Sequence, residues 1–94
     1  MKNTFENEVV YITGASAGIG YATAELCLKH GATVVITGRN KDNLDKAKQE
    51  LLKISSKVVA HNVDVSIESE IDNSLEEIYK SFGKVDGLIN NAPS

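Results

Sequence analysis

The chain has 94 residues, of which 41% are hydrophobic and 24% are charged, and its formal net charge is −3 at pH 7. These values are typical of one small globular domain, and the slight acidity provides no broad basic surface for nucleic acid. The unbroken apolar runs are too short to span a bilayer, and residues 1–6 (MKNTFE) lack the apolar stretch of a signal peptide. We therefore expect a single domain over residues 1–94 that is cytoplasmic and contacts neither nucleic acid nor membrane.

Four short apolar runs rich in β-branched residues alternate with helical patterns along the chain. The runs cover residues 9–12, 33–37, 58–60 and 85–89. Continuous apolar runs of this kind are typical of parallel strands buried on both faces. The predicted order is therefore β-α-β-α-β-α-β, and no linker or repeat divides the chain.

Three helices are predicted between the strands. Asn40 and Ser66 are the expected N-caps of the second and third, and Gly31 is expected to end the first. Cys27, the one cysteine, falls inside the first pattern and is expected to be a small buried hydrophobic residue. The apolar positions follow spacings of three and four residues: Ile19, Ala22 and Leu26; Leu44, Ala47 and Leu51; and Ile67, Ile71, Leu75, Ile78 and Phe82.

Right-handed crossovers between parallel strands determine the topology that this element order can adopt. The predicted fold is α/β, a Rossmann-type parallel sheet with strand order 3-2-1-4 and helices on both faces, equivalent to a truncated doubly wound fold. The first two helices are expected on one face and the third on the other. All carboxyl ends of the strands then meet at one edge, where a ligand site is expected.

The segment that follows the first strand, residues 13–20 (TGASAGIG), leads directly into the first helix. A helix N-terminus presents unpaired N–H groups and roughly +0.5 of an elementary charge, and therefore binds phosphate. Gly14 permits a sharp turn, Gly18 places no Cβ between the backbone and a pyrophosphate, and Gly20 permits close packing of the helix on the strand. The spacing lacks the Gly-Lys-Ser/Thr of a nucleotide-triphosphate loop.

This segment resembles the cofactor signature of the short-chain dehydrogenase/reductase family. Residues 90–92 (NNA) likewise resemble the first three residues of the family's Asn-Asn-Ala-Gly motif, although Pro93 stands where the family has glycine. The resemblance implies an oxidoreductase that uses a nicotinamide dinucleotide to reduce carbonyls or oxidise alcohols. It also implies cofactor contacts from the two motifs: Gly14, Ser16, Gly18, Ile19, Gly20, Asn91 and Ala92.

The end of the second strand bears on the choice of nicotinamide cofactor. NAD-dependent Rossmann proteins usually place an acid here to bind the ribose hydroxyls, whereas residues 37–40 are TGRN. The guanidinium of Arg39 matches a 2′-phosphate in charge and geometry, so NADP is expected over NAD. Thr37 is a candidate second contact to the phosphate. The alternative is that Arg39 is a solvated cation of the loop.

Asp64 and Val65, after the third strand, resemble the family's Asp-Val pair. The resemblance implies that the aspartate accepts a hydrogen bond from the adenine amino group and that the next backbone N–H meets a ring nitrogen. Asp64 could also support the N-terminus of the third helix, and the two roles are compatible. His61 lies at the same adenine end, far from the expected hydride, so a structural role is favoured over acid–base chemistry.

The family's catalytic Tyr-x-x-x-Lys does not occur in this sequence. The three tyrosines are followed four residues later by other residue types: Tyr11 by Ala15, Tyr21 by Glu25 and Tyr79 by Gly83. We therefore predict no catalytic residue and no metal site, and we expect the chain to represent the cofactor-binding part of an oxidoreductase. A small carbonyl or alcohol substrate is expected only for a longer form.

Two other hypotheses remain open. The first is a non-catalytic NADP-binding module or truncated gene product, and the second is a methyltransferase-like α/β domain. The second is disfavoured by Arg39, because such domains usually require an acid after the second strand. In each case the fourth strand is expected at an open sheet edge, where it could pair with another copy of the chain.

Overall fold

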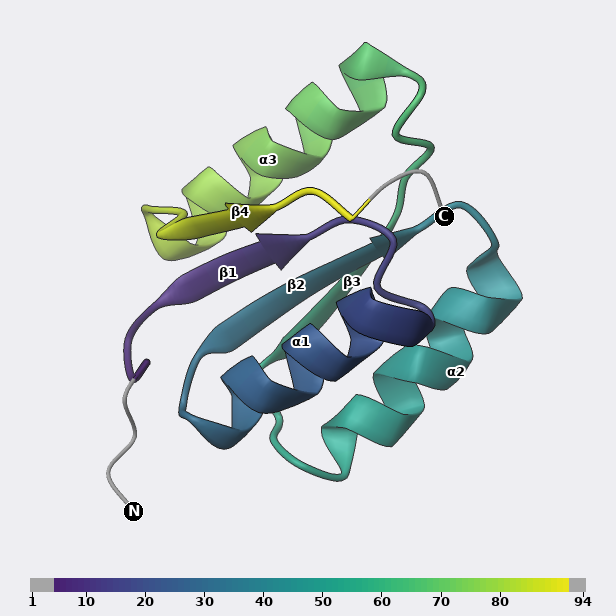
Figure 1. Ribbon diagram of the computed structural model, residues 1–94. Coiled ribbons are helices and arrows are strands. Elements are labelled where there is room, and N and C mark those ends of the chain that lie inside the picture. Colours follow the sequence, from purple (N-terminus) through teal and green to yellow (C-terminus); the bar gives the residue numbers. More distant parts are fainter. Residues whose placement is uncertain (1–4, 92–94) are drawn as a thin grey trace.

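The computed structural model describes residues 5–91. Strands and helices alternate along the chain as the sequence predicts (Figure 1). The elements are β1 (Val9–Ile12), α1 (Gly18–Lys29), β2 (Thr33–Gly38), α2 (Lys41–Leu52), β3 (Val58–Asn62), α3 (Glu68–Phe82) and β4 (Gly87–Ile89).

The four strands form one parallel sheet in the order β3-β2-β1-β4, which confirms the predicted topology. Val10 of β1 pairs with Val34 of β2 on one side and with Gly87 of β4 on the other. The helices α1 and α2 cover one face of the sheet, and α3 covers the opposite face (Figure 1). All four carboxyl ends therefore lie at the same edge.

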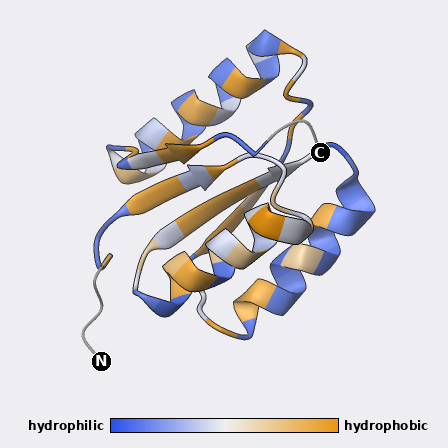
Figure 2. Cartoon of the chain, in the orientation of Figure 1, coloured by the Kyte–Doolittle hydropathy of each residue, from blue (hydrophilic) through white to orange (hydrophobic). Residues whose placement is uncertain are grey.

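The core consists of two layers, because successive strand residues point to opposite faces of the sheet. Figure 2 shows the apolar residues concentrated along β1 and β2, with hydrophilic residues prominent on α2. On the face covered by α1 and α2, the buried residues include Val10, Ile12, Val34, Ile36, Ala24, Leu28, Leu44 and Leu51. On the face covered by α3, they include Val9, Tyr11, Val35 and Ile78.

The buried side of α1 differs from the predicted stripe. Ile19 and Leu26 are 77% and 55% exposed. The helix instead buries Gly20, Ala24, Cys27 and Leu28, three of which are small residues. Small side chains allow the helix to approach the sheet closely, and this close approach outweighs burial of the larger residues. The expected burial of Cys27 is confirmed.

The start of α3 also differs from the prediction. Ile67, not Ser66, is the N-cap residue, and its side chain makes no capping bond. Ser66 lies in the preceding turn, where its N–H and hydroxyl both donate to Asp64 Oδ1 at 2.9 and 2.6 Å. The Asp64 N–H in turn donates to Glu70 Oε1 at 2.9 Å. Asp64 therefore binds the serine that the sequence assigned to the cap.

The other predicted helix boundaries are confirmed. Asn40 is the N-cap of α2, and its side chain accepts a hydrogen bond from the Asn43 N–H at 3.0 Å. Gly31, just after α1, has a φ of +94°, as expected for a glycine that ends a helix. Within residues 5–91, none of the helices combines the length and apolar character that crossing a membrane requires.

The outer strands are less buried than the sequence predicts. The expectation of burial on both faces holds for β1, but Leu88 of β4 is 60% exposed. β4 begins at Gly87, two residues later than the predicted run, and the preceding Asp86 pairs with Val9 partly through its side chain. Val9 N–H donates to Asp86 Oδ2 at 2.7 Å, and Asp86 N–H donates to the Val9 carbonyl at 2.8 Å. β3 extends to Asn62, two residues beyond the predicted run.

Candidate cofactor site

The loops that follow the strands surround a hollow at the carboxyl edge of the sheet. Its volume is about 130 Å³, and it brings together Gly14, Arg39, Asp64 and Val65, which the sequence assigns to cofactor contacts. These four residues follow three different strands, so only the fold makes them neighbours. The full lining is Gly14, Gly38, Arg39, Val63, Asp64, Val65 and Ser66.

The three glycines of the first turn have different structural roles. Gly14 and Gly18 have φ values of +64° and +65°, in the left-handed region that disfavours other residues. A Cβ built on Gly18 would meet no atom within 4 Å, so the backbone there borders open space. A Cβ on Gly20 would lie 2.6 Å from the Gly14 carbonyl oxygen, so this glycine permits close packing of α1 against the turn.

The N-terminus of α1 has the features of an anion site. Its N-cap, Ala17, provides no side-chain bond, and the first turn contains no acidic residue. Ser16 is half-buried beside this end. A Cβ added to Gly38 would lie 3.8 Å from the Cβ of Ser16. Ile19 is exposed in the first turn. The positive end of the helix dipole is therefore not neutralised by its own side chains.

The two residues proposed as phosphate ligands at the end of β2 differ in exposure. The Arg39 side chain is exposed and borders the hollow. Thr37 is completely buried, and its hydroxyl is directed at the Ile12 carbonyl at 3.5 Å. The threonine therefore differs from the expectation: its hydroxyl is within the sheet and is not presented to a ligand. Its carbonyl accepts the Ala15 N–H at 3.1 Å, which connects β2 to the glycine turn.

Asp64 is held as an ionised group. The pKa of its carboxyl is lowered, first by the hydrogen bond from the Ser66 hydroxyl, then by the bond from the Ser66 backbone, and also by the charge of Arg39. These bonds fix the turn before α3, so the structure supports the expected helix-supporting role. Val65 is half-buried beside it.

Hydrogen bonds to Thr13 connect the loop after β4 to the loop after β1. The Asn91 N–H donates to Thr13 Oγ1 at 2.9 Å, and that hydroxyl donates to Asn90 Oδ1 at 3.1 Å. Asn91 Nδ2 also donates to the Gly14 carbonyl at 3.3 Å. Asn91 therefore lies against the glycine turn. Ala92, the other predicted contact in this loop, is outside the described residues, as is Pro93.

Three residues that support this edge were missed by sequence reasoning. Thr13 is a buried polar residue that connects two loops, Asn62 binds two carbonyls of the Arg39 loop, and Glu70 accepts the Asp64 N–H. Of these, Glu70 had a usable signal, since an acid shortly after a helix start commonly bonds back to the preceding turn. Thr13 and Asn62 act on residues distant in sequence, which no local pattern reveals.

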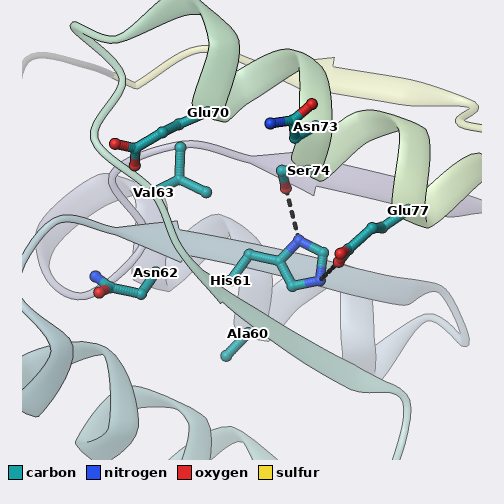
Figure 3. A pocket seen from close by; sticks show the side chains of 8 residues that line it. All are labelled: Ala60, His61, Asn62, Val63, Glu70, Asn73, Ser74 and Glu77. Carbon is teal, nitrogen blue, oxygen red and sulfur yellow. Dashed lines mark hydrogen bonds and ion pairs between the residues drawn. The ribbon is translucent and has the colours of Figure 1, made fainter.

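A second hollow of about 340 Å³ lies between β3 and α3 (Figure 3). The Tyr11 hydroxyl donates to Ser74 Oγ at 2.7 Å, and Ser74 Oγ lies 2.6 Å from His61 Nδ1. His61 Nε2 faces Glu77 Oε2 at 3.6 Å. The histidine therefore connects the strand to the helix, in agreement with its expected structural role.

Comparison with known proteins identifies the family. The family model described as short chain dehydrogenase matches residues 8–94. The chain belongs to the short-chain dehydrogenase/reductase family. Among curated relatives, a probable 2,4-dienoyl-CoA reductase of Bacillus subtilis is 38% identical over 87 residues, which is 93% of this chain and 34% of that protein. The chain therefore spans about a third of the length of this relative.

Solved structures of this family have the same architecture. L-Sorbose reductase from Gluconobacter frateurii, complexed with NADPH and L-sorbose, has a TM-score of 0.90 and 38% identity, over 100% of this chain and 36% of that one. NAD⁺-bound xylitol dehydrogenase has a TM-score of 0.91 and 28% identity, over 97% of this chain and 35% of that one. Both nicotinamide cofactors occur among these neighbours, so family membership alone does not select between them.

Proposed function

We propose that this chain is the NADP(H)-binding part of an oxidoreductase that interconverts a carbonyl and an alcohol. The observation that carries the cofactor assignment is Arg39 at the end of β2, which borders the same hollow as Gly14 of the glycine turn. No acidic residue occupies positions 37–40, where an NAD-dependent protein usually has one.

The proposed binding mode assigns one part of the dinucleotide to each feature. The pyrophosphate lies at the N-terminus of α1, over Gly18, where neither a Cβ nor a cap obstructs it. The adenine enters the hollow beside Asp64 and Val65. The 2′-phosphate pairs with the Arg39 guanidinium, which supplies planar donors. Bound cofactor supplies the hydride chemistry, while this part of the protein binds and orients it.

The test is a titration of the protein with NADPH and NADH. NADPH should bind more tightly, and Arg39→Asp should remove or invert the preference. A hydrogen bond to a charged group contributes about 1.5 to 3 kcal/mol, roughly a 10- to 150-fold change in affinity. Lys57→Asp is the matched control, because Lys57 bonds to the Gly31 carbonyl at the amino edge of the sheet. Equal affinity for the two cofactors in the wild type would refute the assignment.

A second candidate is a binding module without turnover. It requires only the residues that border the hollow at the carboxyl edge of the sheet, such as Gly14, Arg39 and Asp64. The two functions are separated by measuring NADPH oxidation with a panel of small carbonyl compounds beside the binding titration. Tight binding with no turnover supports the module, and measurable carbonyl reduction supports the enzyme.

A further inference from the structure

The side-chain amide of Asn62 holds the backbone that carries Arg39. Its Nδ2 donates to the Gly38 carbonyl at 2.8 Å and to the Arg39 carbonyl at 3.0 Å. Figure 3 shows that Asn62 also lines the second hollow, with its side chain turned away from His61 and Ser74. One amide nitrogen thus donates to two consecutive carbonyls.

The position of Asn62 explains why this contact matters. Asn62 pairs with Gly38 at the end of the β2–β3 ladder, and Val63 N–H makes a further bond to the Gly38 carbonyl at 3.1 Å. Arg39 lies one residue beyond this ladder, so the Asn62 amide extends the attachment to it. On its other side, Asn40 is fixed as the N-cap of α2. The backbone of Arg39 is therefore held from both sides, although its side chain is exposed.

We propose that Asn62 is a positioning residue for cofactor selection, which acts by fixing the Gly38–Arg39 backbone so that the guanidinium meets the 2′-phosphate of NADP. This inference rests on the proposed function. Fixing the backbone of one residue before binding changes a binding constant by roughly a factor of 5 to 30. Loss of this restraint at Arg39 should therefore be measurable. NAD has no 2′-phosphate, so release of Arg39 affects NADP selectively.

A merely structural role makes a different prediction. If Asn62 only stabilised the loop, its removal would lower the affinity of every ligand of the hollow by the same factor, because Arg39 and Asp64 line the same space. The informative quantity is therefore the ratio of two affinities. Adenosine 2′,5′-bisphosphate and adenosine 5′-monophosphate differ in the 2′-phosphate alone, and their binding requires no substrate or turnover.

The experiment measures both dissociation constants by calorimetry for the wild type, Asn62→Ala and Asn62→Leu. The leucine variant preserves the approximate size of the side chain and removes the donors. The bisphosphate preference should fall roughly 5- to 10-fold in both variants, while monophosphate affinity changes little. Asn73→Ala is the matched control, because Asn73 is an exposed asparagine on α3 that lines the second hollow.

A double-mutant cycle shows whether Asn62 acts through Arg39. In an Arg39→Ala background, Asn62→Ala should leave the bisphosphate preference unchanged. A full preference retained by both Asn62 variants overturns the inference and leaves the proposed function intact. A proportional loss of both ligands also overturns it. A wild type that does not prefer the bisphosphate overturns the proposed NADP selectivity together with this inference.

Discussion

The substitution Gly20→Ala tests how closely α1 must approach the glycine turn. Gly20 is the third residue of α1, and its missing side chain faces the turn and the loop after β4. An added Cβ would lie 2.6 Å from the Gly14 carbonyl oxygen, 2.8 Å from Asn91 Nδ2 and 3.1 Å from Ala15 Cα. Two of these neighbours are backbone atoms, so a side-chain rotation cannot relieve the contacts.

The expected magnitude follows from two opposing effects. Overpacking typically costs about 1 to 3 kcal/mol, and three close contacts place this site at the upper end. Alanine in place of glycine inside a helix stabilises the folded state by about 1 kcal/mol, which partly offsets this cost. The net loss in the free energy of unfolding is therefore about 2 kcal/mol, which lowers the Tm of a domain of this size by roughly 8 to 16 °C. Cofactor affinity should also fall, because the displaced helix end is the proposed phosphate site.

Thermal unfolding followed by circular dichroism measures this loss, with Gly87→Ala as the matched control. A Cβ on Gly87 would have its nearest contact at 3.7 Å, with Val10 Cγ1, which is ordinary van der Waals contact. The Gly87 variant should therefore unfold near the wild-type Tm. A Gly20→Ala variant with a Tm equal to or above that of the wild type would show that the glycine turn can shift to accept a Cβ without loss of stability. That result would refute the reasoning.

Three other outcomes are expected. Gly18→Val should abolish dinucleotide binding and also lower the Tm, because valine is strained at a φ of +65°, measured by titration and circular dichroism; retained affinity would place the phosphates elsewhere. Tyr11→Phe should cost about 1 kcal/mol by removing the bond to Ser74. Burial raises the pKa of Tyr11, so the wild type should lose stability as pH rises above about 10, and the variant should lose less in urea titrations. Leu88→Lys on the edge strand should reduce self-association in sedimentation experiments; a wild type that remains monomeric contradicts this.

The fold was predictable because its signals are local and repeated. Each strand run and helical spacing is contained within a few residues, and the handedness of the crossovers then leaves one strand order. The errors occurred where another contact, either local or between distant segments, competes with the preference of the residue type. Ser66 is a good capping residue by type, but Asp64 binds it first. Ile19 and Leu26 are large and apolar, but the small side of α1 packs more closely on the sheet.

The candidate site was predictable to the extent that it follows from strand ends. Parallel strands bring the segments after them to one edge, so Gly14, Arg39 and Asp64 could be assigned together without knowledge of their distances. The orientation of individual side chains could not be assigned in this way. Thr37 is completely buried, although its residue type and position in the sequence are compatible with an exposed hydroxyl. The side chain of Asn62 bonds to Arg39, a residue 23 positions earlier in the chain.

A comparison of the three helix N-termini supports the proposed location of the phosphate site. The positive end of α2 faces its own Asn40 cap and has Asp42 in its first turn, and that of α3 has Glu68 and Glu70. These side chains already partly neutralise the helix dipoles. The α1 terminus has neither a capping bond nor an acid, and Gly18 leaves open space in front of it. This terminus therefore supports the proposed position of the pyrophosphate, and Arg39, which borders the hollow after β2 in a chain of net charge −3, supports the proposed position of the 2′-phosphate.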